Sequence, residues 1–186
     1  MRIIFLLLCV LPFSCVEKEP KEEMQILDFG AFTIEAPSSW TKIEAKGIDS
    51  YVGQIAIGNS DTLHFDFGWY SNDLYESDPT ILDSSQLESI DLSLFDTSNT
   101  FFVKDRRKVD PDMFKKNNIT WDTIDNRKAK IVAPRRSGSG TTGVYFDSVW
   151  ESGSAIDKFN LYGENLKSTN EKEVLAAIKT LKFHEQ

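Results

Sequence analysis

Two segments in which apolar and polar residues alternate flank a short turn between residues 51 and 70. The turn, Gly58 to Asp61, contains residues that tolerate positive φ, as a hairpin turn requires. The second segment has a large apolar side chain at every other position, the period that places side chains on one face of a strand. These side chains are Leu63, Phe65, Phe67 and Trp69. The pattern predicts a central antiparallel hairpin in which Phe65 and Trp69 are almost fully buried.

The same period of two recurs along much of the remaining chain. It predicts strands at residues 29–36, 100–103, 121–125, 128–133, 144–150 and 156–166. The segment at 144–150 is apolar on both faces, which is typical of a strand inside a sheet. In the last strand, Phe159 and Leu161 are expected to face the core, and Lys158 and Asn160 to face outward. The glycine-rich segment 134–143 is predicted to be a mobile loop.

Helical patterns are fewer. Asn170 and Glu173 have the spacing of a capping box, and the apolar residues that follow recur at helical spacing. This predicts a C-terminal amphipathic helix that packs on the sheet through Val174, Leu175, Ile178 and Leu181. A short helix is expected after Asp110, whose side chain is a suitable N-cap. Residues 72–99 are expected to have mixed structure.

These elements predict an α+β fold with a single antiparallel β-sheet flanked by helices, in one globular domain of residues 29–186. Four stretches also suggest a family: Phe32 to Ile34 with Pro37 and Trp40, the long hairpin at residues 51–70, Phe159 to Leu166, and Ala176 to Phe183. Their order resembles the PsbP-like fold, an alpha/beta/alpha sandwich. That fold is mostly used for binding and assembly, so the resemblance implies no catalytic residue.

The chain opens with an apolar run, Ile3 to Leu11, that is too short for a bilayer span of about 20 residues. The run is followed by Ser14 and Cys15, and a small residue before a cysteine resembles the lipobox at which bacterial lipoproteins are cleaved and acylated. This predicts a signal peptide at residues 1–14 and lipidation of Cys15. A flexible tether is expected at residues 15–28, because its charged residues bury little apolar surface. The alternative is an ordinary secretory signal with an incidental cysteine.

Lipidation of Cys15 implies a location in the bacterial cell envelope. The protein is then attached through its lipid to a membrane, and the outer membrane is expected, on its periplasmic or its surface face. Cys9 leaves with the signal peptide, so the mature chain has no free cysteine and no disulfide. The domain must therefore be stabilised by its core alone.

The charges are unevenly distributed along the chain. Residues 47–103 contain ten acidic residues and no Lys or Arg, whereas residues 104–136 contain eleven basic and five acidic residues. The net charge of −8 argues against a nucleic-acid partner. Two interpretations stay open. In the first, the two blocks neutralise one another in the fold. In the second, arginine side chains form an anion-binding patch, since arginine binds carboxylate and phosphate with paired hydrogen bonds. The candidate patch consists of Arg106, Arg107, Arg135 and Arg136.

The acidic segment after the hairpin contains four side chains that are able to offer oxygen ligands. They are Asn72, Asp73, Glu76 and Asp78. Their spacing lacks the alternation and the closing glutamate of an EF-hand calcium loop. A solvated acidic loop is therefore expected here, not a calcium site.

Catalytic patterns are weak. His64 and Asp66 share one face of the central strand, but a zinc site needs further ligands, so no metal is predicted. Ser137 and Ser139 lie in a loop, not on the sharp strand-to-helix turn of a hydrolase nucleophile. The sequence predicts no catalytic residue and no cofactor, and it favours a non-catalytic envelope lipoprotein that binds a protein or an anionic glycan. The alternative is an envelope hydrolase that uses His64 and nearby carboxylates.

Overall fold

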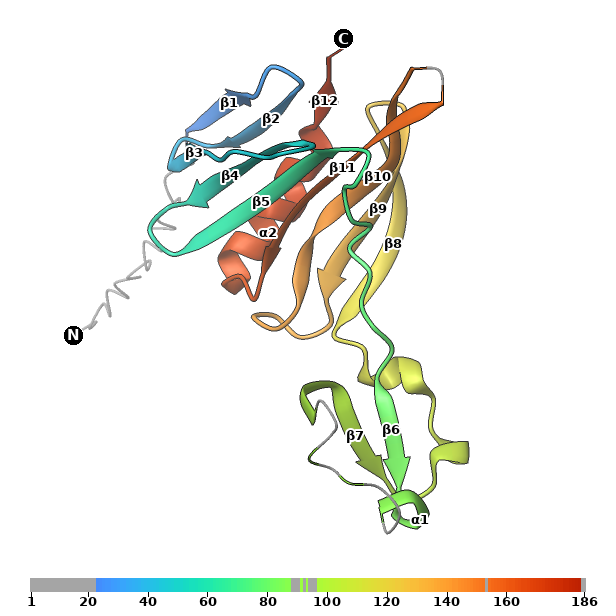
Figure 1. Ribbon diagram of the computed structural model, residues 1–186. Coiled ribbons are helices and arrows are strands. Elements are labelled where there is room, and N and C mark those ends of the chain that lie inside the picture. The colour runs from blue at the N-terminus through green and yellow to red at the C-terminus, as the bar shows by residue number, and fades with distance from the viewer. Residues whose placement is uncertain (1–22, 88–90, 92, 94–96, 153, 185–186) are drawn as a thin grey trace, which may run out of the picture.

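The structure is a computed structural model that describes residues 23–184 apart from 88–90, 92, 94–96 and 153 (Figure 1). The predicted signal peptide, Cys15 and the tether as far as residue 22 lie outside the described residues. The predicted end of the tether at residue 28 is wrong, because Met24–Asp28 form strand β1, which pairs with β2. None of the described helices is long and apolar enough to cross a membrane.

The main sheet contains seven antiparallel strands in the order β3-β4-β5-β11-β10-β9-β8. The strands are β3 (Trp40–Glu44), β4 (Tyr51–Ile57), β5 (Asp61–Gly68), β8 (Asn117–Ile124), β9 (Arg127–Pro134), β10 (Thr141–Ser152) and β11 (Ala155–Glu164). The hairpin of β4 and β5 is confirmed. The interior position predicted for residues 144–150 is also confirmed, because β10 lies between β9 and β11.

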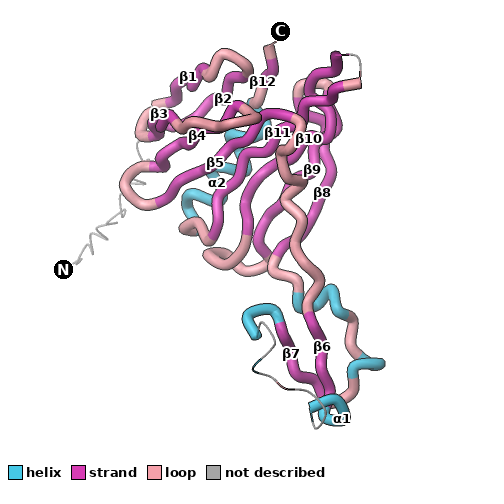
Figure 2. Tube along the Cα trace, in the orientation of Figure 1, coloured by secondary structure: helices cyan, strands magenta, loops and turns pink. Residues whose placement is uncertain are grey.

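A second layer covers one face of the main sheet, which we call the inner face (Figures 1 and 2). It consists of a three-stranded sheet and a C-terminal helix with a short 3₁₀ extension. The sheet has the order β1-β2-β12, with β2 at Phe32–Pro37 and β12 at Lys182–Phe183. Helix α2 spans Ser168–Ala177, and η5 spans Ile178–Thr180.

A small lobe lies beyond one end of the main sheet (Figure 1). Its two strands, β6 (Thr80–Asp83) and β7 (Thr100–Val103), are parallel. The lobe also contains α1 (Ser84–Leu87), η2 (Thr97–Asn99), η3 (Arg106–Lys108) and η4 (Pro111–Phe114). The predicted strand at 100–103 is confirmed, and the helix expected after Asp110 is a 3₁₀ turn whose cap is the Asp110 side chain.

The predicted fold class, a single antiparallel sheet flanked by helices, is wrong. The described chain forms three sheets, and α2 is the only described helix longer than four residues. Residues 24–37 form paired strands of a second sheet, and residues 80–83 add a strand where mixed structure was expected. The protein is mostly β, so the PsbP-like sandwich does not describe it.

An aromatic cluster fills the core between the two layers. Phe32 of β2 is fully buried at its centre, with ring-centroid distances of 5.1 Å to Phe65 and 4.8 Å to Phe159. Phe183 of β12 contributes from the small sheet, 5.2 Å from Phe159. The inward side chains of α2 and η5 close the cluster, as the amphipathic pattern predicted, and include Val174 and Ile178.

Two local predictions at the ends of these elements are wrong. Trp69 is 48% exposed, because β5 ends at Gly68 and the chain then leaves the sheet, whereas Phe65 is buried as expected. Helix α2 begins at Ser168, before the predicted cap Asn170. Its first turn is held from the β4–β5 turn instead, where the Asp61 carboxylate accepts hydrogen bonds from Asn170 Nδ2 at 2.7 Å and from the Lys167 amide at 2.9 Å.

The position of Phe32 predicts a large effect on stability. We expect Phe32→Ala to lower the free energy of unfolding by about 3 to 5 kcal/mol, because it leaves a cavity inside the aromatic cluster. The same exchange at Phe102, which is 52% exposed on β7, should cost less than about 1 kcal/mol. Denaturant unfolding of both variants measures the difference. Equal losses would show that the core is not centred on Phe32.

Candidate functional site

The opposite, outer face of the main sheet is crossed by the connection between β5 and β6, residues 69–79, which we call the strap (Figure 1). The strap is held by polar groups of three strands of the main sheet, β5, β11 and β9. Ser71 Oγ donates to the carbonyl oxygen of Asp66 at 2.8 Å, and the Asn72 carbonyl accepts from Asn160 Nδ2 at 3.0 Å. Farther along, the Asp73 carbonyl accepts from Lys130 Nζ at 2.7 Å. The segment expected to be a solvated acidic loop is therefore fixed to the sheet.

The strap buries side chains that point away from the core. Asn160 faces outward, as predicted, yet it is fully buried beneath the strap, and Lys130 is buried as well. Both side chains find backbone carbonyls of the strap as acceptors, which offsets the cost of removing them from water.

A carboxylate attaches the end of the strap to the start of β8. Glu76 Oε1 accepts from the Lys116 amide at 2.6 Å, while Oε2 accepts from the Asn117 amide at 3.0 Å and from Asn117 Nδ2 at 2.9 Å. Asn117 Oδ1 in turn accepts from the Thr141 amide of β10 at 2.8 Å. The contact thus connects the strap, β8 and β10 through one carboxylate and one carboxamide.

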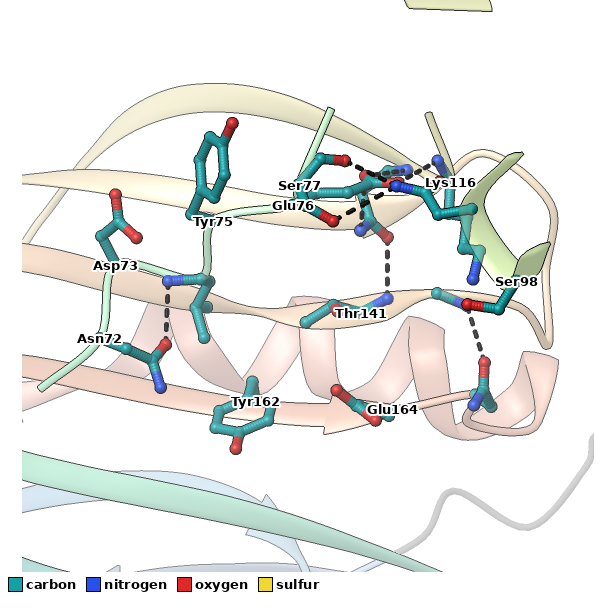
Figure 3. A pocket seen from close by; sticks show the side chains of 15 residues that line it. Asn72, Asp73, Tyr75, Glu76, Ser77, Ser98, Lys116, Thr141, Tyr162 and Glu164 are labelled. Atoms are coloured by element: carbon teal, nitrogen blue, oxygen red, sulfur yellow. Dashed lines mark hydrogen bonds between the residues drawn. The ribbon is translucent and has the colours of Figure 1, made fainter. Parts of the chain in front are cut away.

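A groove of about 540 Å³ opens between the strap, the sheet and the small lobe (Figure 3). Its lining comes from five parts of the chain. It comprises strap residues 72–77, Ser98 and Asn99 of the lobe, Lys116 and Asn117, Gly140 and Thr141, and Tyr162, Glu164 and Asn165. The volume falls within the range of about 300–1,000 Å³ that is usual for sites of small ligands.

One glycine lies beside the groove floor and shapes it. Gly143 of β10 is in register with Tyr162 of β11. A Cβ at position 143 would lie 2.4 Å from the Leu161 carbonyl oxygen and 2.6 Å from Tyr162 Cβ, so only glycine fits here. The Tyr162 side chain consequently has no outward neighbour from that position of β10.

The groove is polar and carries an excess of carboxylates. Asp73, Glu76 and Glu164 line it, against one lysine, Lys116. Burial raises the pKa of Tyr162 above its ordinary value, and the carboxylates of Glu164 and Asp66 raise it further. Tyr162 therefore stays a neutral phenol, able to donate and accept hydrogen bonds, throughout the physiological range.

The lobe end of the groove is held by Asn99 of η2. Its Nδ2 donates to the carbonyl oxygens of Ser77 and Asp78, each at 3.2 Å. An ion pair of 3.2 Å between Lys115 and Asp78 lies at the same junction. Together with the 3.9 Å pair of Lys130 and Asp73, it joins the acidic and basic blocks, so the two blocks meet in part.

The four candidate arginines are distributed over two places. Arg106 and Arg107 lie on η3 of the small lobe, where Arg107 pairs with Asp105 at 3.2 Å. Arg107 lines a second cavity of about 530 Å³ together with Lys104 and Lys108. Arg135 and Arg136 follow β9, and Arg135 Nη1 donates to the Asp112 carbonyl at 2.6 Å. Anion binding by these arginines stays a prediction, at two locations.

His64 and Asp66 share the outer face of β5, as predicted, but the histidine contacts the side-chain carboxamide of Gln54. Its Nδ1 lies 3.2 Å from Gln54 Nε2, and its ring centroid lies 5.8 Å from that of Tyr162. His64 does not line the groove. Within the described part of the chain, no group of three His, Cys, Asp or Glu side chains is arranged to hold a metal ion.

The loop after β9 is fixed to the helix, which corrects the predicted mobile loop. Ser137 Oγ donates to Glu171 Oε2 at 2.7 Å, and the Gly138 amide donates to Glu171 Oε1 at 2.6 Å. Ser137 is thus engaged by a helix carboxylate. No histidine contacts it among the described residues.

Comparison of the chain with protein-family models, with curated proteins and with solved structures finds no match.

Proposed function

We propose that the protein is a non-catalytic lipoprotein of the bacterial cell envelope that binds a partner in the groove beneath the strap. The observation that carries the proposal is the groove itself, whose walls are fixed by the Glu76 and Asn99 contacts. A rigid site with several unengaged polar side chains is suited to recognition. Membrane attachment rests on the apolar run that precedes Ser14 and Cys15.

The alternative, a hydrolase that uses His64, has less support. A general base of this kind is usually oriented by a carboxylate, whereas the partner of His64 Nδ1 is the Gln54 carboxamide. Within the groove, both oxygens of Glu76 accept hydrogen bonds from backbone amides. These contacts suit a structural role for Glu76, not proton transfer.

The membrane attachment predicts that Cys15→Ser abolishes acylation. The variant should then lose palmitate labelling and move from the membrane fraction to the soluble fraction. If the Cys15→Ser protein stays with membranes in high salt, the lipid anchor at this residue is wrong.

The binding site predicts that filling the groove abolishes partner capture. Thr141→Tyr places a large uncharged side chain at the floor of the groove, and Thr123→Tyr makes the same exchange at an exposed position of β8. Tagged protein with each change is used to capture material from detergent-solubilised envelopes. We expect capture to be lost with Thr141→Tyr and retained with Thr123→Tyr. Equal capture by both variants would place the binding site elsewhere.

A further inference from the structure

We propose that the ligand of the groove is a neutral oligosaccharide. This inference rests on the proposed binding function and adds the chemical class of the ligand. It differs from the anionic glycan expected from the arginines, because the groove is lined by three carboxylates and a single lysine. A polyanion would meet repulsion there, whereas an uncharged ligand would not.

Two tyrosine rings offer flat apolar surfaces to such a ligand. Tyr75 of the strap is 67% exposed, and Tyr162 lies on β11 at the other side of the groove (Figure 3). An aromatic ring covers the C–H face of a pyranose, and a tyrosine adds a hydroxyl group that is able to bind a sugar hydroxyl. The two side chains point in opposite directions from the two sides of the groove, and each supplies both kinds of contact (Figure 3).

The unengaged polar groups are of mixed type. Asn72 and Asn165 use their Oδ1 atoms to accept backbone amides, which leaves each Nδ2 as a donor without a partner among the described residues. Glu164 is exposed and supplies acceptors. A sugar hydroxyl donates one hydrogen bond and accepts others, so it requires donors and acceptors side by side. A simple anion uses donors alone, and a simple cation uses acceptors alone.

The sheet beneath the groove disfavours an extended peptide. Strands β10 and β11 form the floor and pair with each other along it, with Thr141 opposite Glu164 and Gly143 opposite Tyr162. The Thr141 amide donates to Asn117 Oδ1 and the Asn165 amide to the Gly140 carbonyl, so the floor offers these groups to no added strand. Recognition must use side chains, which suits a ligand that carries hydroxyl groups around a ring.

Titration calorimetry with the full folded domain tests the assignment. The probes are neutral hexasaccharides of glucose, mannose, galactose or N-acetylglucosamine, with hexagalacturonate and hexalysine as charged probes. We expect at least one neutral probe to bind with little dependence on salt, since no net charge is screened. Tyr75→Ala should weaken its binding by about tenfold or more. Tyr70→Ala is the matched control, because Tyr70 is an exposed strap residue outside the groove.

The other outcomes separate this inference from the proposed function. If only a charged probe, hexagalacturonate or hexalysine, binds, and its binding is sensitive to salt and weakened by Tyr75→Ala, the neutral oligosaccharide assignment is wrong. The result still supports a binding groove. If none of the probes binds, the oligosaccharide assignment is also wrong. The capture experiment with Thr141→Tyr then tests the proposed binding function separately. Release of reducing sugar from a bound probe overturns the non-catalytic function.

Discussion

The Glu76 carboxylate is the contact on which the arrangement of the outer face depends. It accepts hydrogen bonds from the amides of Lys116 and Asn117 at the start of β8, about 40 residues later in the chain. Charge-assisted hydrogen bonds of this kind are stronger than those between neutral groups. The contact holds the strap across the sheet, forms one wall of the groove and joins the small lobe to the main sheet. Without it, the end of the strap would keep the Asn99 hydrogen bonds to the lobe and the ion pair of Asp78 with Lys115, but no hydrogen bond to the start of β8.

The two faces of the main sheet are stabilised by different interactions. The inner face packs its aromatic side chains against the small sheet and α2, and this burial provides most of the driving force for folding. The outer face buries polar side chains, Asn160 and Lys130, which are stable there because strap carbonyls accept their hydrogen bonds. A polar network of this kind adds geometric specificity, and it leaves a rigid floor on which Tyr162 is half-buried and Glu164 is exposed.

The sequence predicted the strands whose apolar residues alternate and face the core, such as β5 and β11. It missed β1, β3 and β6. The strap has no such sequence pattern, since it is held by single hydrogen bonds between side chains and backbone carbonyls. Asn72 to Asp78 therefore resembled a solvated loop, and Asn160 resembled an exposed residue. The groove also depends on strand register, which places Gly143 opposite Tyr162, and on the pairing of Glu76 with Asn117. The predicted fold class was wrong because residues 24–37 form a second sheet.

Hydrogen exchange of the Lys116 and Asn117 amides in a Glu76→Gln variant measures how strongly this carboxylate fixes the strap. The variant keeps the size of the side chain but removes the charge and one acceptor oxygen, with a loss of about 1 to 3 kcal/mol in local stability. We expect both amides to exchange about tenfold faster or more, while the amides between β10 and β11 keep their rates. Glu164→Gln, which makes the same change at a groove carboxylate, should leave the Lys116 and Asn117 amides unaffected. Unchanged exchange at both amides in Glu76→Gln would contradict the claim that this carboxylate fixes the strap.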